Sequence, residues 1–253
     1  MTINKQSNLY TIAYIAALAV VVGAALAITS LSLHDRQQQN ADRDKMRQIL
    51  AAAHITVPAD SVIAAYKRDI TDAYIVNAEG KRVEGDAFDV DVDAQTKMPA
   101  LRRLLPVFEC RAADGEMKYI LPVYGAGLWG PIWGYVAFDA DGSTIYGAYF
   151  AHKGETPGLG AEIEKPAFSS EFIGKTVFKQ GVFMPVAVVK AGQKPLGGED
   201  YVDGISGGTI TSKGVGSHAL RLPDAIRRIF EKPQSEEIQL SHGRENRQQK
   251  RVL

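Results

Sequence analysis

The sequence predicts an α+β protein. A single transmembrane helix near the N-terminus is followed by one mixed α/β domain built around an antiparallel sheet. The segment from Leu9 to Leu33 contains no charged residue and no histidine. Strand-like runs of apolar, β-branched and aromatic residues dominate the rest of the chain, and the helical patterns there are short. Asp141-Gly142 separates two of these runs. This pair is a strong hairpin signal, so it favours antiparallel pairing.

The uncharged segment is long enough to cross a membrane. At about 1.5 Å per residue it forms a helix of roughly 37 Å, against a hydrocarbon core of about 30 Å. The alternative is a cleaved signal peptide, because Ala25-Leu26-Ala27 looks like a small-residue cleavage site. The apolar part of a signal peptide is shorter, about 7–15 residues. We therefore expect a single-pass anchor within an N-terminal segment, residues 1–34.

Residues 35–232 are expected to form the folded domain. Residues 233–253 are polar, without a periodic apolar face, and we expect this tail to be disordered. The pattern predicts a helix over 37–53 and strands over 73–76, 118–124, 133–138, 145–150 and 186–190. Short helices are expected over 97–105, 169–173 and 212–231.

The alternating Asp and Val residues of 89–93 predict a strand with one solvated face. A calcium-binding EF-hand loop is the other structure that such aspartates could form. That loop needs Gly at its sixth position and Glu at its twelfth. Ala94 and Ala100 occupy these positions, so a calcium loop is excluded.

The balance of charges argues against a nucleic-acid partner, because 29 basic residues face 29 acidic ones. The one cysteine, Cys110, cannot form an internal disulfide and is expected to be a small packing residue.

The charged residues beside the anchor bear on its orientation in the membrane. One basic residue precedes the anchor and four follow it within 14 residues, Arg36, Arg43, Lys45 and Arg47. This count favours a cytoplasmic C-terminal side.

The first segment that could carry chemistry is rich in glycine and tryptophan, residues 125–134. It contains Leu128 and both tryptophans of the chain, Trp129 and Trp133. Glycine lets a flat ring approach the backbone, and tryptophan can stack on such a ring. The alternative is a tight turn whose tryptophans fill the core.

The second segment, residues 151–160, follows a predicted strand. It offers backbone N–H groups, the Thr156 hydroxyl and an apolar tip at Leu159, a surface that suits a polar aromatic ligand. A plain loop of turn residues is the alternative. His152 has no second histidine at metal-ligand spacing, so no metal site is expected here.

The third segment, residues 203–212, combines glycines and hydroxyls before a predicted helix. Such a segment can bind phosphate through backbone N–H groups and the helix dipole. It lacks the Gly-Lys-Ser/Thr ending of a P-loop, and it does not match Gly-x-Gly-x-x-Gly. A helix cap rich in Ser, Thr and Gly is the alternative.

Together, these segments resemble a known family. Asp203-Gly-Ile-Ser-Gly-Gly-Thr209 resembles the flavinylation motif of FMN-binding domains, Asp-x-x-Ser/Thr-Gly-Ala-Thr. Residues 127–130 and 154–160 resemble further signatures of the C subunits of sodium-translocating NADH:quinone reductases, and the similarity runs from about residue 8 to 232. One position departs from the motif, because Gly208 replaces the usual Ala.

The resemblance implies an electron-transfer subunit with FMN bound covalently to Thr209 through a phosphoester bond, and no acid/base catalytic site of its own. A separate flavin transferase would attach the FMN, and the other partners would be the membrane and the remaining subunits of the complex. The family places the soluble domain on the periplasmic face of the bacterial inner membrane, against the charge count. The residues expected at the cofactor are Leu128, Trp129, Glu155, Thr156, Gly158, Leu159, Lys190, Asp203, Ser206, Gly207, Gly208, Thr209 and Thr211.

Two other functions fit parts of this pattern. The G subunits of the related ferredoxin:NAD oxidoreductase complexes share the threonine motif and the anchor, although the 154–160 loop favours the quinone reductase. A non-redox, membrane-anchored binding module is also compatible, with the Ser-Gly-Gly-Thr turn serving only as a helix cap.

Overall fold

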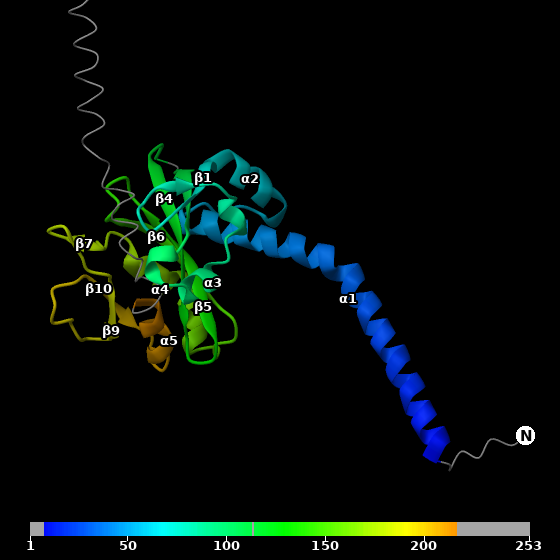
Figure 1. Cartoon of the computed structure of the whole chain (residues 1–253). Coiled ribbons are helices and arrows are strands. Elements are labelled where there is room, and N and C mark those ends of the chain that lie inside the picture. Colours follow the sequence, from blue (N-terminus) through cyan, green and yellow to red (C-terminus); the bar gives the residue numbers. More distant parts are fainter. Residues whose placement is uncertain (1–7, 113, 217–253) are drawn as a thin grey trace, which may run out of the picture. The chain divides into compact units, whose positions relative to one another are not determined.

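The computed structural model describes residues 8–112 and 114–216 (Figure 1). The chain divides into two compact units, Met1–Met46 and Arg47–Leu253. The predicted boundary lay at residue 34, within helix α1.

The N-terminal segment forms one helix, α1 (Asn8–Ala52), where the sequence analysis expected two helices. The three residues that separate the two predicted helices, His34 to Arg36, include no proline or glycine, so nothing breaks the helix there. By length and composition α1 can cross a membrane.

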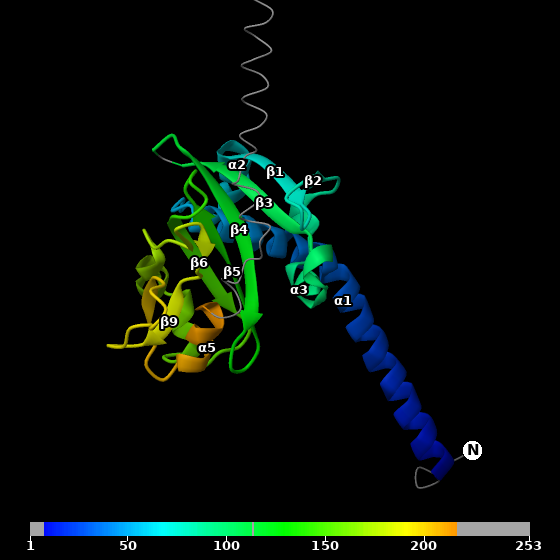
Figure 2. The ribbon, with the colours of Figure 1, turned by 60° about the vertical axis from the view of Figure 1, so that its left-hand side comes forward.

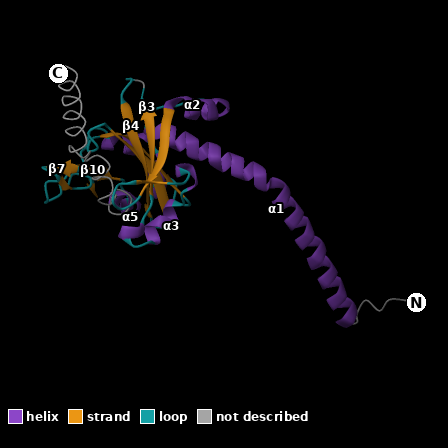
Figure 3. Cartoon of the chain, turned by 45° about the horizontal axis from the view of Figure 1, so that its top comes forward, coloured by secondary structure: helices purple, strands orange, loops and turns teal. Residues whose placement is uncertain are grey.

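The domain is built on a six-stranded sheet, drawn in orange in Figure 3, with the order β2-β1-β3-β4-β5-β6. Every neighbouring pair is antiparallel, which confirms the predicted sheet type. The predicted hairpin between β5 and β6 is also present, with Gly142 at φ 66° and its N–H donating to the Asp139 carbonyl at 2.9 Å. The strands are β1 (Ile70–Val76), β2 (Arg82–Val83), β3 (Leu105–Arg111), β4 (Met117–Ala126), β5 (Pro131–Phe138) and β6 (Ile145–His152).

Buried apolar clusters stabilise the sheet. In one cluster, Ile49 and Ala52 of the last turn of α1 pack with Phe108, Cys110 and Ile120 of the sheet. Burial, and to a smaller extent Asp69, raise the pKa of the Cys110 thiol to about 12, so it is a packing residue as predicted. The other cluster packs the sheet against the short helices η4 (Gly160–Glu164), α4 (Pro166–Ser169) and η5 (Ser170–Phe172).

Smaller elements complete the domain. The parallel pair β9 (Ala187–Lys190) and β10 (Tyr201–Gly204) leads into α5 (Thr209–Gly214), and β7 (Phe178–Lys179) pairs with β8 (Val182–Phe183). The remaining elements, which precede β3, are η1 (Ala59–Ser61), α2 (Val62–Asp69), η2 (Ala87–Asp89), α3 (Val92–Lys97) and η3 (Ala100–Arg102).

The strand predicted over 89–93 is wrong, because this segment ends η2 and begins α3. Two aspartates, one within the alternating segment 89–93 and one before it, cap short helices. Asp91 accepts a hydrogen bond from the Ala94 N–H at 3.1 Å, and Asp86 caps η2 through the Phe88 N–H at 2.8 Å.

Of the helix predicted over 97–105, only the short 3₁₀ helix η3 (Ala100–Arg102) is present between α3 and β3. Helix α3 ends at Lys97, two residues before Pro99, and the chain enters strand β3 at Leu105. The helix predicted over 212–231 begins three residues earlier, at Thr209, and its part beyond residue 216 lies outside the described residues, as does the tail 233–253. The helix predicted over 169–173 corresponds to α4 and η5.

The backbone adopts an unusual conformation two residues after α1. His54 adopts φ 60°, a left-handed conformation that is uncommon for a residue with a side chain. Its Nε2 donates a hydrogen bond to the Tyr146 carbonyl at 2.9 Å, and its ring meets the Tyr146 ring edge-on. The end of α1 is therefore fastened to β6 by a side chain.

A buried lysine lies at the start of β4. The Lys118 side chain is 2% exposed, and its Nζ lies 2.8 Å from Glu116 and from Asp139 and 3.1 Å from Asp114. Nζ also lies 4.4 Å from the centre of the Tyr146 ring. Burial alone would lower the pKa of Lys118, but the hydrogen bonds to the three carboxylates raise it above its usual value.

Candidate functional site

Three segments that are far apart in the sequence meet at one end of the sheet. They are the β4–β5 turn (126–131), the loop between β6 and η4 (153–159), and the loop from β10 into α5 (205–208). Figure 2 shows α5, in orange, beside the ends of β4 and β5. The side chain of Glu155 accepts hydrogen bonds from Trp129 of the β4–β5 turn and from Thr211 of α5. Leu159 contacts the loop before α5. The structure thus joins the three segments singled out by sequence.

The loop before α5 is closed by its own hydrogen bonds. Gly207 adopts φ 74°, a conformation that favours glycine, and the Gly208 N–H donates to the Ile205 carbonyl at 3.0 Å. The Ser212 hydroxyl donates to the Gly208 carbonyl at 2.8 Å and accepts from the Ile205 N–H at 3.3 Å. Sequence reasoning missed Ser212, although a serine four residues after Gly208 on a helix is placed to bond back to that carbonyl.

The hydroxyls of this segment differ in accessibility. Thr209 is the first residue of α5 and is half-buried, and Ser206 is exposed. Thr211 is 1% exposed, and its Oγ1 donates to Glu155 Oε2 at 2.5 Å. Ser212 is buried, and its hydroxyl is hydrogen-bonded to the Gly208 carbonyl. Thr209 is therefore partly accessible to solvent, whereas Thr211 is not.

Large apolar side chains are exposed on two of these segments and on the first turn of α5. None of them is less than 42% exposed: Leu128 and Trp129 of the β4–β5 turn, Leu159 of the loop before η4, and Ile210 of α5. Burying such side chains is favourable, so this surface suits a ligand with a flat apolar face. Ile210 was not predicted, because nothing in the sequence distinguishes it from a core residue.

The two tryptophans have different roles. Trp129 is 71% exposed at the turn. Trp133 is half-buried in β5, and its Nε1 donates to Gln48 Oε1 of α1 at 3.1 Å. Of the two alternatives for this segment, core packing fits Trp133 and a ligand surface fits Trp129.

The positions of Glu155, Thr156 and Gly158 follow from the local turn. Gly158 adopts φ 75°, and the Thr156 carbonyl accepts from the N–H groups of Leu159 and Ala161. Thr156 is exposed, and the Glu155 side chain is buried beneath the loop. This turn presents Thr156 and Leu159 outward.

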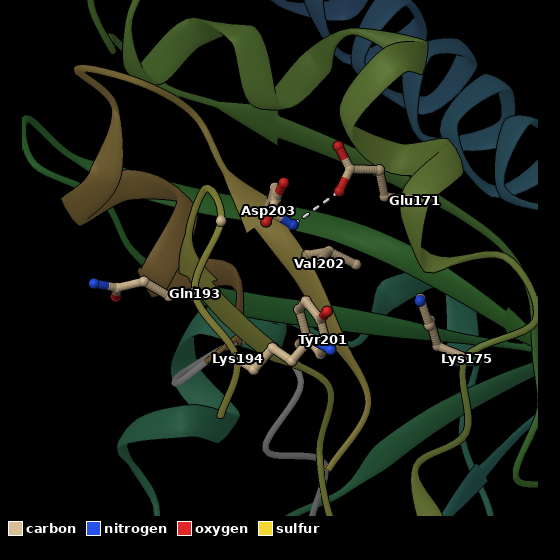
Figure 4. Close-up of a pocket in the computed structure, with 8 residues that line it drawn as sticks. Glu171, Lys175, Gln193, Lys194, Tyr201, Val202 and Asp203 are labelled. Carbon is tan, nitrogen blue, oxygen red and sulfur yellow. Dashed lines mark hydrogen bonds between the residues drawn. The ribbon is translucent and has the colours of Figure 1, made fainter. Parts of the chain in front are cut away.

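Asp203 and Lys190 lie on the neighbouring parallel strands. Lys190 is exposed at the end of β9, opposite Gly204 in the register, and Asp203 donates its N–H to Glu171 Oε2 at 2.8 Å. Figure 4 shows Asp203 at the wall of a pocket of about 420 Å³, and no other predicted site residue lines it. The other lining residues are Glu171, Lys175, Gly192, Gln193, Lys194, Tyr201 and Val202.

Gly208 accommodates a close approach of the backbone. A Cβ added there would lie 2.9 Å from the carbonyl carbon and oxygen of Leu159 and 3.1 Å from the Gly160 nitrogen. The neighbours are backbone atoms and cannot rotate away. The alanine that is usual in the motif would therefore displace the Leu159 loop in this chain.

We expect Gly208→Ala to destabilise the domain by about 1–3 kcal/mol, because the added methyl group overpacks a backbone contact. Urea unfolding of the full chain in detergent measures this change. Gly154→Ala is the matched control, because a Cβ there meets nothing within 4 Å. Equal stability of the two variants would contradict the prediction.

The chain is similar in sequence and in structure to known proteins. Residues 127–219 match the model of the FMN-binding domain family. The C subunit of the Na(+)-translocating NADH-quinone reductase of Vibrio vulnificus (strain YJ016) is 34% identical over 228 residues, 84% of this chain and 89% of that protein. The corresponding protein of Pseudomonas aeruginosa is 31% identical over 234 residues, 84% and 90% of the two chains. The crystal structure of the corresponding protein from Parabacteroides distasonis is 49% identical, with a TM-score of 0.73, over 80% of this chain and 98% of that one.

Proposed function

We propose a function for this chain from its family, because it belongs to the C subunits of the Na(+)-translocating NADH-quinone reductases and contains their FMN-binding domain. It is an electron-transfer subunit of such a complex. Its proposed partners are the other subunits of the complex, and α1 is the proposed membrane anchor.

The observation that carries the proposal is the setting of Thr209. The three family segments meet beside the start of α5, whose first residue is Thr209, and two of them carry exposed apolar side chains, Leu128, Trp129 and Leu159. An isoalloxazine ring is flat, with an apolar dimethylbenzene end and a polar pyrimidine end, so exposed apolar side chains beside the exposed Thr156 fit FMN. We therefore propose that FMN is joined through its phosphate to Thr209 Oγ1.

Attachment requires a separate flavin transferase, which is the proposed maturation partner. Thr209 Oγ1 forms a bond to the phosphorus on the FMN side of FAD, and the pyrophosphate bond breaks. AMP leaves, and the hydroxyl loses its proton. The accessible position of Thr209 supports this step, since Thr211 and Ser212 are buried in their own hydrogen bonds.

When bound, FMN supplies one-electron and two-electron redox chemistry. The chain's own residues then bind and shield it. Trp129 and Leu159 are proposed to flank the flavin ring. Lys190, at the end of β9, is proposed to stabilise the negative charge of the reduced flavin or of its phosphate.

The test is the intact mass of the chain, made in its native host or together with a flavin transferase. The mass should exceed that of the polypeptide by FMN less one water, and the band should fluoresce on a denaturing gel. A mass equal to the bare polypeptide under these conditions would refute covalent attachment.

We further propose that the domain after α1 faces the periplasm of a bacterial inner membrane, as the family resemblance implies. The basic residues beside the anchor favour the opposite side, but long domains translocate largely regardless of charge. A reporter that works only in the periplasm should be active when fused after Glu231, and protease added to spheroplasts should digest the domain. A silent reporter and a protected domain would reverse the orientation.

A further inference from the structure

Glu155 has an unusual position for a residue of a surface loop. It lies between β6 and η4, in a loop whose other members from Lys153 to Leu159 are exposed, yet its side chain is 4% exposed. Its backbone N–H donates to His152 Nδ1 at 3.1 Å, which fixes the start of the loop. A buried carboxylate needs hydrogen-bond donors to offset its loss of water.

The two donors come from two different segments of the site. Oε1 accepts from the Trp129 N–H at 2.8 Å, and Oε2 accepts from the Thr211 hydroxyl at 2.5 Å. Trp129 belongs to the β4–β5 turn, and Thr211 lies in the first turn of α5, two residues after Thr209. One carboxylate thus connects its own loop to the β4–β5 turn and to the helix that begins at Thr209.

Two glycines make room for this carboxylate. A Cβ at Gly127 would lie 2.5 Å from Oε1, and a Cβ at Gly160 would lie 2.5 Å from Oε2 and 2.7 Å from Thr211 Oγ1. Any other residue at either position would push the carboxylate out of place. The packing of the site is therefore adapted to Glu155 from two sides.

We infer that Glu155 is a positioning residue, which holds the Trp129 turn and the first turn of α5 at a fixed separation around the flavin. The inference rests on the proposed function, because it assumes a flavin on Thr209. The carboxylate acts through Trp129 and Thr211 and lies beneath the exposed surface that would contact the ring. From its sequence, Glu155 was instead predicted to lie at the cofactor itself.

Three variants separate geometry from charge and from general stability. Glu155→Ala removes both hydrogen bonds. Glu155→Gln preserves them, because the amide oxygen can accept from the Trp129 N–H while the amide N–H donates to a rotated Thr211 hydroxyl. Lys118→Met removes a buried ion-pair cluster at the opposite end of β4 and serves as the control for lost stability.

The first measurement does not depend on flavin. Hydrogen exchange of the Trp129 amide in the full chain should be about tenfold faster in Glu155→Ala, because its acceptor is lost, and should return toward the wild-type rate in Glu155→Gln. Wild-type exchange in Glu155→Ala would overturn the inference. If Glu155→Ala fails to fold, Thr211→Val replaces it, since valine keeps the shape and removes the bond between Glu155 and α5. Exchange is then followed at the Ser212 amide in the first turn of α5, where it should become faster, and an unchanged rate there overturns the inference.

The second measurement uses chains whose mass shows flavin on Thr209. Glu155→Ala should lower the flavin fluorescence anisotropy and shift its midpoint potential, and neither Glu155→Gln nor Lys118→Met should do so. An equal shift in Glu155→Gln would assign the effect to charge, and an equal shift in Lys118→Met would assign it to stability. Either result refutes the positioning role. Absence of flavin from the wild-type chain refutes the proposed function and this role with it, while the exchange rates still show whether Glu155 joins the segments.

Discussion

Replacing Thr209 with valine is expected to abolish covalent flavin, because valine keeps the shape of threonine but has no hydroxyl to form the phosphoester. Thr209 is half-buried at the first position of α5, directly after the N-cap residue Gly208, so the exchange should leave the fold intact. The intact mass should fall to that of the polypeptide, and the fluorescent band on a denaturing gel should disappear. The effect is all or none, because the chemistry needs this oxygen.

Thr211→Ser is the matched control for this prediction. Serine keeps the hydroxyl that bonds Glu155, so the added mass should remain. Flavin that persists in Thr209→Val and disappears when the Thr211 hydroxyl is removed would identify Thr211 as the acceptor. That result would require α5 to open, because Thr211 is buried in the structure.

Replacing Lys118 with methionine is expected to cause a large loss of stability. Methionine matches the length of lysine but leaves Asp114, Glu116 and Asp139 close together without their cation. The loss at pH 7 should be about 2 kcal/mol, below the 3–5 kcal/mol typical of a fully buried pair, because the three carboxylates keep part of their contact with water. Urea unfolding of the full chain in detergent measures it.

The pH dependence of this loss has a definite sign. The Glu116 N–H, and after it Lys118, hold the pKa of Asp114 below its usual value, so the stability that this carboxylate contributes is lost as the pH falls through its folded pKa. The folded pKa of Lys118 is raised, so its contribution is complete below the pKa of an unfolded lysine, about 10.4. The difference between wild type and Lys118→Met should therefore be greatest near neutral pH and shrink toward pH 3.

Lys97→Met is the control for this second prediction. Lys97 also pairs with an aspartate, Asp93 at 2.7 Å, but the pair is exposed on the surface of α3. Exposed ion pairs contribute little to stability, so the free energy of unfolding of this variant should be close to that of the wild type at pH 7 and at pH 3. A similar loss in the two variants would show that burial of Lys118 does not matter.

The long strands were predictable because their side chains carry the signal. Strands β4, β5 and β6 are long, rich in aromatic and β-branched residues, and separated by glycine-containing turns, so local pattern and tertiary pairing agree. Strand β3 was missed because Pro106 and Cys110 interrupt its pattern. It forms because β1 and β4 pair with it on both sides, which is information that no local window contains.

The candidate site was predictable in its segments but not in its geometry. The glycine-rich motifs identified the three loops, and the loops do meet. The burial of Glu155 and Thr211 could not be predicted, because it depends on where two glycines, Gly127 and Gly160, lie in space. Asp203 belongs to the same motif as Thr209, yet it lines a separate pocket because β10 carries it toward Glu171.

Strand β6 is an edge of the sheet, and edge strands can recruit strands from other chains. Here the outward backbone groups near both ends of β6 already have partners within the domain. Ile145 exchanges hydrogen bonds with the segment 174–175, the Tyr146 carbonyl accepts from His54, and the His152 N–H donates to Glu164. A foreign strand would have to displace all three. Neighbouring subunits are therefore expected to recognise this edge of the domain through loops and side chains, and not by extending the sheet at β6.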